Sequence, residues 1–269
     1  MHEHDDPHQV ALDWPHVYRA GSSAASGGAH SPGADSPGAD SPGAVSPGAA
    51  SPGDDSPGAD SPGADSPVLL MLHGTGGNEQ EILTLADAVD PAATVLAPRG
   101  RVTEGGMLRW FRRLSEGVFD VDDVVVRAGE LAGFIAWARQ HYHLGERPII
   151  AVGFSNGANI ALATALLHPA VLDRIVAFSG MFPLDDRALS TQLSGTRVLM
   201  LNGRSDPMAP LTSADRAAAT LTERGALVER ELRDGGHGIA ATDVAAARAW
   251  LAHPTQTRAT PAHPTQTRA

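Results

Sequence analysis

The stretch that decides the fold is Gly153-Phe154-Ser155-Asn156-Gly157. The apolar residues 148–152 before it predict a buried strand, and the alanine- and leucine-rich residues 158–167 after it predict a helix. A serine between glycines at such a junction is typical of a sharp strand-to-helix turn, because that turn leaves no room for side chains beside the serine. The pattern predicts that Ser155 stands exposed at the carboxyl edge of a sheet, where the first N–H groups of the helix favour negative charge.

Short apolar runs alternate with helix-like runs along most of the chain. Strands are expected at residues 68–72, 94–97, 148–152, 174–178, 197–201 and 227–232, with a weaker edge strand at 14–20. Helices are expected at residues 79–89, 122–145, 213–224 and 242–251, the first three capped by Asn78, by Asp122 and Asp123, and by Ser213. Residues 99–122 look like a loop. This alternation predicts an α/β fold with a mostly parallel central sheet and helices on both faces.

The composition predicts one globular domain. With 269 residues the chain can bury one sizeable core but not two large ones. Most of the excess behind its formal net charge of −11 lies in residues 1–13 and 31–65, which leaves no basic stripe for nucleic acid. The chain has no cysteine, so a disulfide or a thiolate nucleophile is excluded. Because neither a signal peptide nor a membrane-spanning run is visible, we expect a cytoplasmic protein that binds neither membranes nor nucleic acid.

Three segments are expected to lack regular structure. Residues 31–67 repeat the pentapeptide Ser-Pro-Gly-Ala-Asp with small variations, and such a run has no apolar surface to bury. Residues 1–13 are expected to be flexible, and the tail 253–269, which repeats one short motif, is expected to be disordered. The folded domain is therefore expected at residues 14–252, interrupted by the pentapeptide repeat. We interpret the repeat as a spacer, with a partner-docking arm as the alternative.

Two later loops carry the partners that a serine nucleophile needs. A serine hydroxyl requires a base within hydrogen-bond reach and an acid that orients that base. Asp206 and His237 each follow a predicted strand, so both are expected at the carboxyl edge of the sheet. We therefore expect Ser155 as the nucleophile, His237 as the base and Asp206 as the acid, in this chain order, although each of the last two could be an ordinary loop residue. The alternatives for the acid do not directly follow a strand: Asp185, Asp186 and Asp215.

Backbone donors for an oxyanion are expected on both sides of Ser155. One is the N–H group of Asn156, directly after the serine. The other is the N–H group of Thr75, in the glycine-rich turn that follows the strand expected at 68–72. We interpret His73, in the same turn, as a structural residue and not as a second base.

The loop at residues 99–122 holds candidates for substrate contact. Trp110 and Phe111 are candidates for the wall of an acyl pocket, and Arg112 or Arg113 for attracting an anionic group of the substrate. Alternatively, the aromatic side chains pack the loop and the arginines stay solvated, as exposed arginines often do.

Seven stretches form one joint pattern: Leu72 to Glu79, Ala97 to Gly100, Arg109 to Phe111, Gly153 to Ala158, Phe178 to Gly180, Asn202 to Pro207 and Gly236 to Gly238. Together they resemble the phospholipase/carboxylesterase family of small α/β-hydrolases. The resemblance is closest to carboxylesterases of the hydroquinone-resistance type and more distant to acyl-protein thioesterases and dienelactone hydrolases. Dienelactone hydrolases usually carry a cysteine nucleophile, so their chemistry is not expected of a chain without cysteine.

The resemblance implies a single-domain α/β-hydrolase fold with no lid domain, no metal and no cofactor. It implies a serine esterase in which Ser155, Asp206 and His237 form the triad and Thr75 and Asn156 supply the oxyanion donors. We expect a carboxylesterase acting on short-chain or aryl esters, with a small-molecule ester as its partner, as a monomer or homodimer. The alternatives are a thioesterase or lysophospholipase using the same site, or a non-catalytic ligand-binding protein of the same fold.

Overall fold

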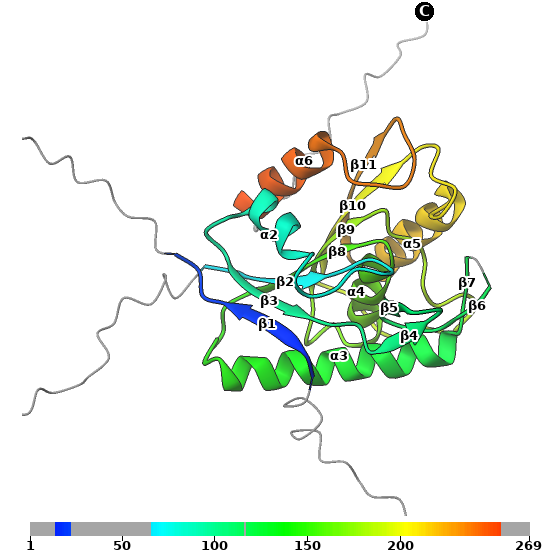
Figure 1. Cartoon of the computed structure of the whole chain (residues 1–269). Coiled ribbons are helices and arrows are strands. Elements are labelled where there is room, and N and C mark those ends of the chain that lie inside the picture. Colours follow the sequence, from blue (N-terminus) through cyan, green and yellow to red (C-terminus); the bar gives the residue numbers. More distant parts are fainter. Residues whose placement is uncertain (1–13, 23–65, 116, 254–269) are drawn as a thin grey trace, which may run out of the picture.

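The computed structural model describes residues 14–22, 66–115 and 117–253 (Figure 1). Our expectations for residues 1–13, for residues 31–65 of the pentapeptide repeat and for residues 254–269 of the tail lie outside these described residues. Within them, no helix combines the length and the apolar character that crossing a membrane requires.

A seven-stranded sheet forms the centre of the described chain, in the order β1-β3-β2-β8-β9-β10-β11. All neighbouring strands are parallel except β1, which pairs antiparallel with β3 at the edge. The prediction of a mostly parallel sheet is therefore confirmed. The strands are β1 (His16–Arg19), β2 (Val68–Leu72), β3 (Thr94–Pro98), β8 (Ile149–Phe154), β9 (Arg174–Phe178), β10 (Arg197–Gly203) and β11 (Leu227–Arg233).

Helices cover both faces of this sheet, as the alternating pattern predicted (Figure 1). Along β2, Leu70 and Leu72 pack into the core on one face, while Leu69 and Met71 pack into the core on the other. This alternation follows from the two-residue period of a strand, and it explains why β2 is apolar throughout. The first face is covered by α3 (Val121–His141), α4 (Asn156–Leu167) and α5 (Leu211–Glu223), the second by α2 (Leu83–Val89) and α6 (Ala241–Ala252).

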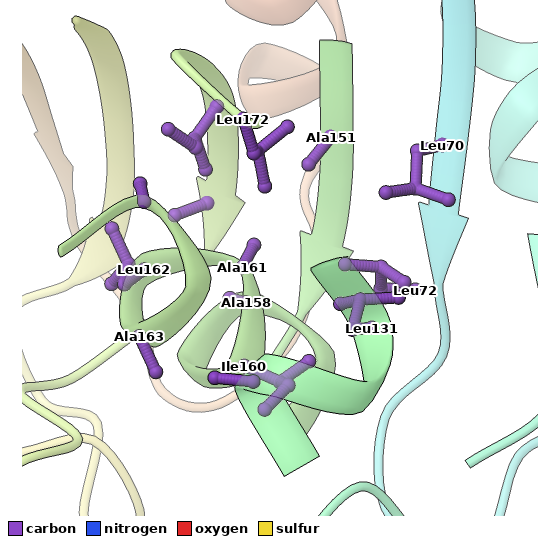
Figure 2. Close-up of a cluster of buried hydrophobic side chains, with 14 of the residues drawn as sticks. Leu70, Leu72, Leu131, Ala151, Ala158, Ile160, Ala161, Leu162, Ala163 and Leu172 are labelled. Atoms are coloured by element: carbon purple, nitrogen blue, oxygen red, sulfur yellow. The ribbon is translucent and has the colours of Figure 1, made fainter. Parts of the chain in front are cut away.

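Helix α4 is the most deeply placed of these helices. Every residue from Asn156 to Leu166 is buried, which accounts for the absence of a polar face in its sequence. Its alanines let β2, β8 and α3 approach closely, and Figure 2 shows side chains of these four elements meeting in one cluster. Because α4 cannot shift without disturbing this core, the position of Ser155, directly before the first residue of the helix, is fixed.

The loop predicted at residues 99–122 contains two small hairpins. They are formed by β4 (Val102–Glu104) with β5 (Met107–Arg109), and by β6 (Arg113–Ser115) with β7 (Val118–Phe119). Their strands are two or three residues long, too short to show a periodic pattern in the sequence. The segment 183–196 between β9 and β10 forms no helix or strand in the part of the chain that is described.

Three helix starts differ from the predicted ones. Helix α3 is capped by Asp120, whose side chain accepts from the N–H of Asp123, and not by the acidic pair that follows it. Helix α5 begins at Leu211, and the hydroxyl of Ser213 instead accepts from the N–H of Phe182. Helix α2 begins at Leu83, five residues after Asn78, whose side chain instead accepts from the N–H groups of Gln80 and Glu81 in the turn before the helix. Ser213 and Asp123 accept hydrogen bonds from the backbone of distant loops, at Phe182 and Arg112, and local sequence does not reveal such contacts.

Candidate active site

Ser155 occupies a strained turn between β8 and α4. Its backbone has φ +52° and ψ −116°, which a residue with a side chain rarely adopts. The flanking glycines are sterically required. A Cβ built on Gly153 would lie 2.5 Å from the carbonyl oxygen of Gly157, and one built on Gly157 would lie 2.0 Å from that of Leu72. The predicted sharp turn is present, and it presents the serine hydroxyl at the carboxyl end of the sheet.

His237 bridges Ser155 and Asp206. Its Nε2 lies 2.9 Å from Ser155 Oγ, and its Nδ1 lies 2.8 Å from Asp206 Oδ2. With Nδ1 protonated and donating to the carboxylate, Nε2 is free to accept the serine proton. The three residues predicted from separate loops are thus brought within hydrogen-bonding distance, in the order that general-base activation of a serine requires.

Asp206 is held as a carboxylate. Its side chain is fully buried, and besides His237 it accepts hydrogen bonds from the N–H groups of Met208 and Ala209. Burial alone would raise the pKa of Asp206, but the hydrogen bonds from His237 and from these backbone groups outweigh it and lower the pKa. An ionised carboxylate beside Nδ1 fixes the tautomer of the histidine and stabilises its protonated form.

The alternative acids lie elsewhere. Asp185 and Asp186 are exposed and pair with Arg216, while Asp215 pairs with Arg230 on α5 and β11. None of the three has a contact with His237 among the described residues, whereas Asp206 does.

The turn after β2 is fixed by His73. This side chain is 1% exposed, its Nδ1 donates to the carbonyl of Gly74, and its Nε2 accepts from the N–H of Gly100. Burial lowers the pKa of His73, so the ring is a neutral structural group, in agreement with its interpretation as a turn residue. The hydroxyl of Thr75 in the same turn accepts from Arg109 Nη1 at 2.9 Å.

A cavity of about 240 Å³ opens next to Ser155. Thr75 and Asn156, the predicted oxyanion donors, both line it together with the serine. Asn156 is the first residue of α4, so its backbone N–H has no carbonyl partner within the helix. The remaining lining is mainly apolar with two arginines and consists of Met107, Arg109, Arg113, Gly117, Phe119, Asn159, Ser179, Met181 and Met208.

Trp110 and Phe111 do not line this cavity, which corrects their expected role as its wall. They are 2% and 0% exposed and belong to the core. The indole Nε1 of Trp110 donates to the carbonyl of His73, and its backbone N–H donates to the side-chain oxygen of Asn156. These contacts connect the hairpin region to the turn after β2 and to the first residue of α4, which lie on either side of the Ser155 hydroxyl. Their burial, rather than contact with substrate, accounts for two aromatic residues in the loop.

The apolar wall of the cavity comes from residues that sequence reasoning did not single out. Met107 and Phe119 lie on the short hairpins, and Met181 and Met208 lie in loops after β9 and β10. Arg113 lines the cavity and pairs with Glu104, whereas Arg112 pairs with Asp120. The sequence offers one indication that Met181 and Met208 line the site. Each lies in a loop directly after a strand, and the carboxyl ends of these strands face the site.

We looked for side chains that could bind a metal ion together in residues 14–22, 66–115 and 117–253. No group of three or more histidine, aspartate or glutamate side chains is placed there to hold a metal ion.

Comparisons with known proteins all find hydrolases or carboxylesterases. The family model described as Phospholipase/Carboxylesterase matches residues 60–254. The hydrolase MhqD of Bacillus subtilis (strain 168) is 40% identical over 183 residues, which cover 68% of this chain and 91% of that protein.

Solved structures agree with this match. The crystal structure of the Bacillus cereus carboxylesterase superposes with a TM-score of 0.66 at 38% identity, and covers 70% of this chain and 88% of that one. The carboxylesterase from Mesorhizobium loti superposes with a TM-score of 0.66 at 31% identity, and covers 70% of this chain and 89% of that one.

Proposed function

Because the chain belongs to the phospholipase/carboxylesterase family and is an ester hydrolase of the α/β-hydrolase fold, we propose that it cleaves short-chain or aryl carboxylic esters with Ser155 as its nucleophile. The observation that carries this proposal is the hydrogen-bonded series from Ser155 through His237 to the buried Asp206. A decayed, purely ligand-binding site would have no reason to keep all three groups in reach of one another.

The first half of the reaction forms an acyl-enzyme. Ser155 Oγ attacks the ester carbonyl carbon while His237 Nε2 takes the hydroxyl proton. The carbonyl oxygen becomes an oxyanion, which the N–H groups of Thr75 and Asn156 and the start of α4 stabilise. His237 then gives its proton to the departing alkoxide, so the alcohol leaves neutral and the acyl group stays on the serine.

The second half returns the enzyme to its starting state. Water enters the place of the alcohol, and His237 Nε2 takes its proton as the oxygen attacks the acyl carbon. The oxyanion forms again at the same donors and collapses by releasing Ser155 Oγ, which recovers its proton from the histidine. Asp206 stays ionised throughout and stabilises the imidazolium in both halves.

The cavity supports small esters as substrates. A volume of about 240 Å³ lies below the roughly 300–1,000 Å³ of typical ligand pockets, and it suits a short acyl chain or one aromatic ring. Thioether side chains around it adapt their shape easily, so the pocket accommodates more than one small acyl group. Long-chain lipids and acyl-proteins would need a longer groove than this cavity provides.

A panel of p-nitrophenyl esters of increasing chain length, assayed for the wild type and Ser155→Ala, tests the proposal. We expect the wild type to prefer short chains, and Ser155→Ala to lose about 10⁴-fold or more in kcat at unchanged folding. Activity rising steadily with chain length would favour a thioesterase or lysophospholipase. Equal activity of the two proteins would rule out Ser155 as the nucleophile.

Two further proposals rest on the sequence alone. We propose a cytoplasmic location and a monomeric or homodimeric state. Cell fractionation tests the first, and light scattering of the purified protein tests the second.

A further inference from the structure

The carbonyl groups on both sides of His237 are held by one side chain. Arg233, the last residue of β11, donates from Nη2 to the carbonyl of Gly236 at 3.0 Å and to the carbonyl of Gly238 at 2.6 Å. These are the residues directly before and after His237. Two hydrogen bonds from a planar guanidinium to neighbouring carbonyls restrict the peptide planes that orient the imidazole.

The guanidinium is itself anchored from its other side. Its Nε donates to Asp243 Oδ2 at 2.6 Å, and Asp243 is 4% exposed. The same carboxylate oxygen accepts from the N–H of Ala240 at the start of α6. Arg233 is therefore fixed between a buried anion on α6 and the loop that carries His237, and it cannot rotate freely.

The loop has little stiffness of its own. Three of the five residues from 234 to 238 are glycines, and Gly235 adopts φ +127°, a conformation that other residues avoid. One further contact, from the hydroxyl of Ser179 to the carbonyl of Gly238 at 3.3 Å, supports the same peptide. Side-chain contacts from outside the loop thus supply the rigidity that its sequence lacks.

Arg233 also connects this loop to the loop of Asp206. Its backbone carbonyl accepts from the N–H of Arg204 at 2.9 Å, and the carbonyl of Gly235 accepts from the N–H of Ser205 at 2.9 Å. The residue thereby joins the strand ends that present the acid and the base. A shift of its side chain would change the position of His237 relative to both Asp206 and Ser155.

We propose that Arg233, anchored by Asp243, is a positioning residue that holds the imidazole of His237 in line with Ser155 Oγ. This inference rests on the proposed function for its kinetic effect, and on the contacts alone for its effect on the loop. A residue that only attached α6 to the sheet would need the bond to Asp243 but not the bonds to the two carbonyls.

Arg233→Lys separates these two roles. Lysine keeps the positive charge, but its single nitrogen cannot stand both in the place of Nε, which donates to Asp243, and in the place of Nη2, which donates to the two carbonyls. The matched control is Arg204→Lys, because Arg204 lies on the neighbouring loop and its side chain pairs only weakly with the exposed Asp234, at 3.6 Å. Two further variants leave Arg233 itself unchanged. Asp243→Asn weakens the anchor of the guanidinium, and Ser179→Ala removes the other side-chain contact to the carbonyl of Gly238.

Steady-state kinetics on a short p-nitrophenyl ester and hydrogen exchange of residues 234–240 provide the readouts. For Arg233→Lys we expect kcat to fall by about 10- to 100-fold with KM within about twofold of the wild type, since a displaced general base slows chemistry more than binding. Exchange in residues 234–240 should rise while exchange in β8 and α4 stays unchanged. Arg204→Lys should match the wild type in both measurements, and Asp243→Asn and Ser179→Ala should show smaller losses of the same kind.

A wild-type kcat in a folded Arg233→Lys, or an equal loss in Arg204→Lys, would overturn the proposal. If Arg233→Lys does not fold, Asp243→Asn decides, because it removes the charge that anchors Arg233 and lies outside the cavity lining. A wild-type kcat with wild-type exchange of residues 234–240 in that variant would then count against the proposal. If the wild type hydrolyses no ester, the proposed function fails, yet exchange in residues 234–240 still tests whether Arg233 holds the loop.

Discussion

Gly157 and the carbonyl of Leu72 are in such close contact that a Cβ on Gly157 would lie 2.0 Å from the oxygen. This contact joins the first turn of α4 to the end of β2, directly before the turn that carries Thr75. The two predicted oxyanion donors, Thr75 and Asn156, therefore come from segments locked against each other. The geometry of the site depends on a glycine that takes no part in the chemistry.

Gly157→Ala should destabilise the protein by about 3 kcal/mol or more, because the backbone carbonyls of Leu72 and His73 leave no space for a methyl group. Thermal or urea unfolding measures the loss. Gly133→Ala on α3 is the matched control, since a Cβ there meets nothing within 4 Å. We expect that variant to be neutral or more stable by up to about 1 kcal/mol. Similar losses in both variants would show that the contact with Leu72 is not the cause.

Asp206→Asn should fold normally and lower kcat by about 10³- to 10⁴-fold, because an amide in this place favours the wrong tautomer of His237. Ester hydrolysis at neutral pH measures the effect. Asp215→Asn is the control, since Asp215 is exposed and pairs with Arg230. A comparable loss in the control, or none in Asp206→Asn, would contradict the assignment of the acid.

Glu79 should make stability depend on acid pH. Its carboxylate is 5% exposed, and hydrogen bonds from Arg99 at 2.7 and 2.5 Å lower the pKa of Glu79. A carboxyl whose pKa is lowered by folding stabilises the protein above its unfolded pKa, and this stabilisation is lost as pH falls through its folded pKa.

Glu79→Gln should therefore have a lower Tm than the wild type at pH 7, and the difference should shrink as the pH falls below about 4.3, the ordinary pKa of a glutamate. Differential scanning calorimetry from pH 7 to pH 3 measures both curves. A difference in Tm that stays constant over this range would show that the ionised pair with Arg99 does not stabilise the fold.

Met181 and Trp110 should affect different properties. Met181→Ala enlarges the cavity and should shift the ester preference toward bulkier acyl groups, with a stability loss of about 2 kcal/mol or more. Trp110→Phe leaves the carbonyl of His73 without its buried donor and should cost about 1–3 kcal/mol with the ester preference unchanged. The ester panel together with urea unfolding distinguishes the two. If Trp110→Phe changed the ester preference and Met181→Ala did not, Trp110 and not Met181 would line the acyl pocket.

The features predictable from sequence were those with local patterns. Apolar runs such as residues 68–72 and 149–152 belong to strands buried on both faces. A serine flanked by glycines at a strand-to-helix junction indicates a sharp turn with no room for side chains. Chain order then identified Asp206 and His237 as candidates, because parallel strands end at one edge of the sheet. The family match and the superposed structures agree with the fold derived in this way.

The features that could not be predicted depend on distant contacts. Trp110 is buried because its indole reaches the carbonyl of His73, which lies 37 positions away in the chain. Met181 and Met208 line the cavity because two loops after different strands meet there, and neither carries a motif. The arrangement around Arg233 likewise requires α6 to bring Asp243 beside the end of β11. Side-chain orientation in short hairpins and loops is a tertiary property.

Labelling with a fluorophosphonate, followed by intact mass and peptide mapping, tests the central claim most directly. The account predicts one adduct per folded chain, on Ser155, with none in Ser155→Ala and labelling slowed by orders of magnitude in His237→Ala. A folded wild-type protein that takes up no label, or takes it up at a residue other than Ser155, would contradict the account.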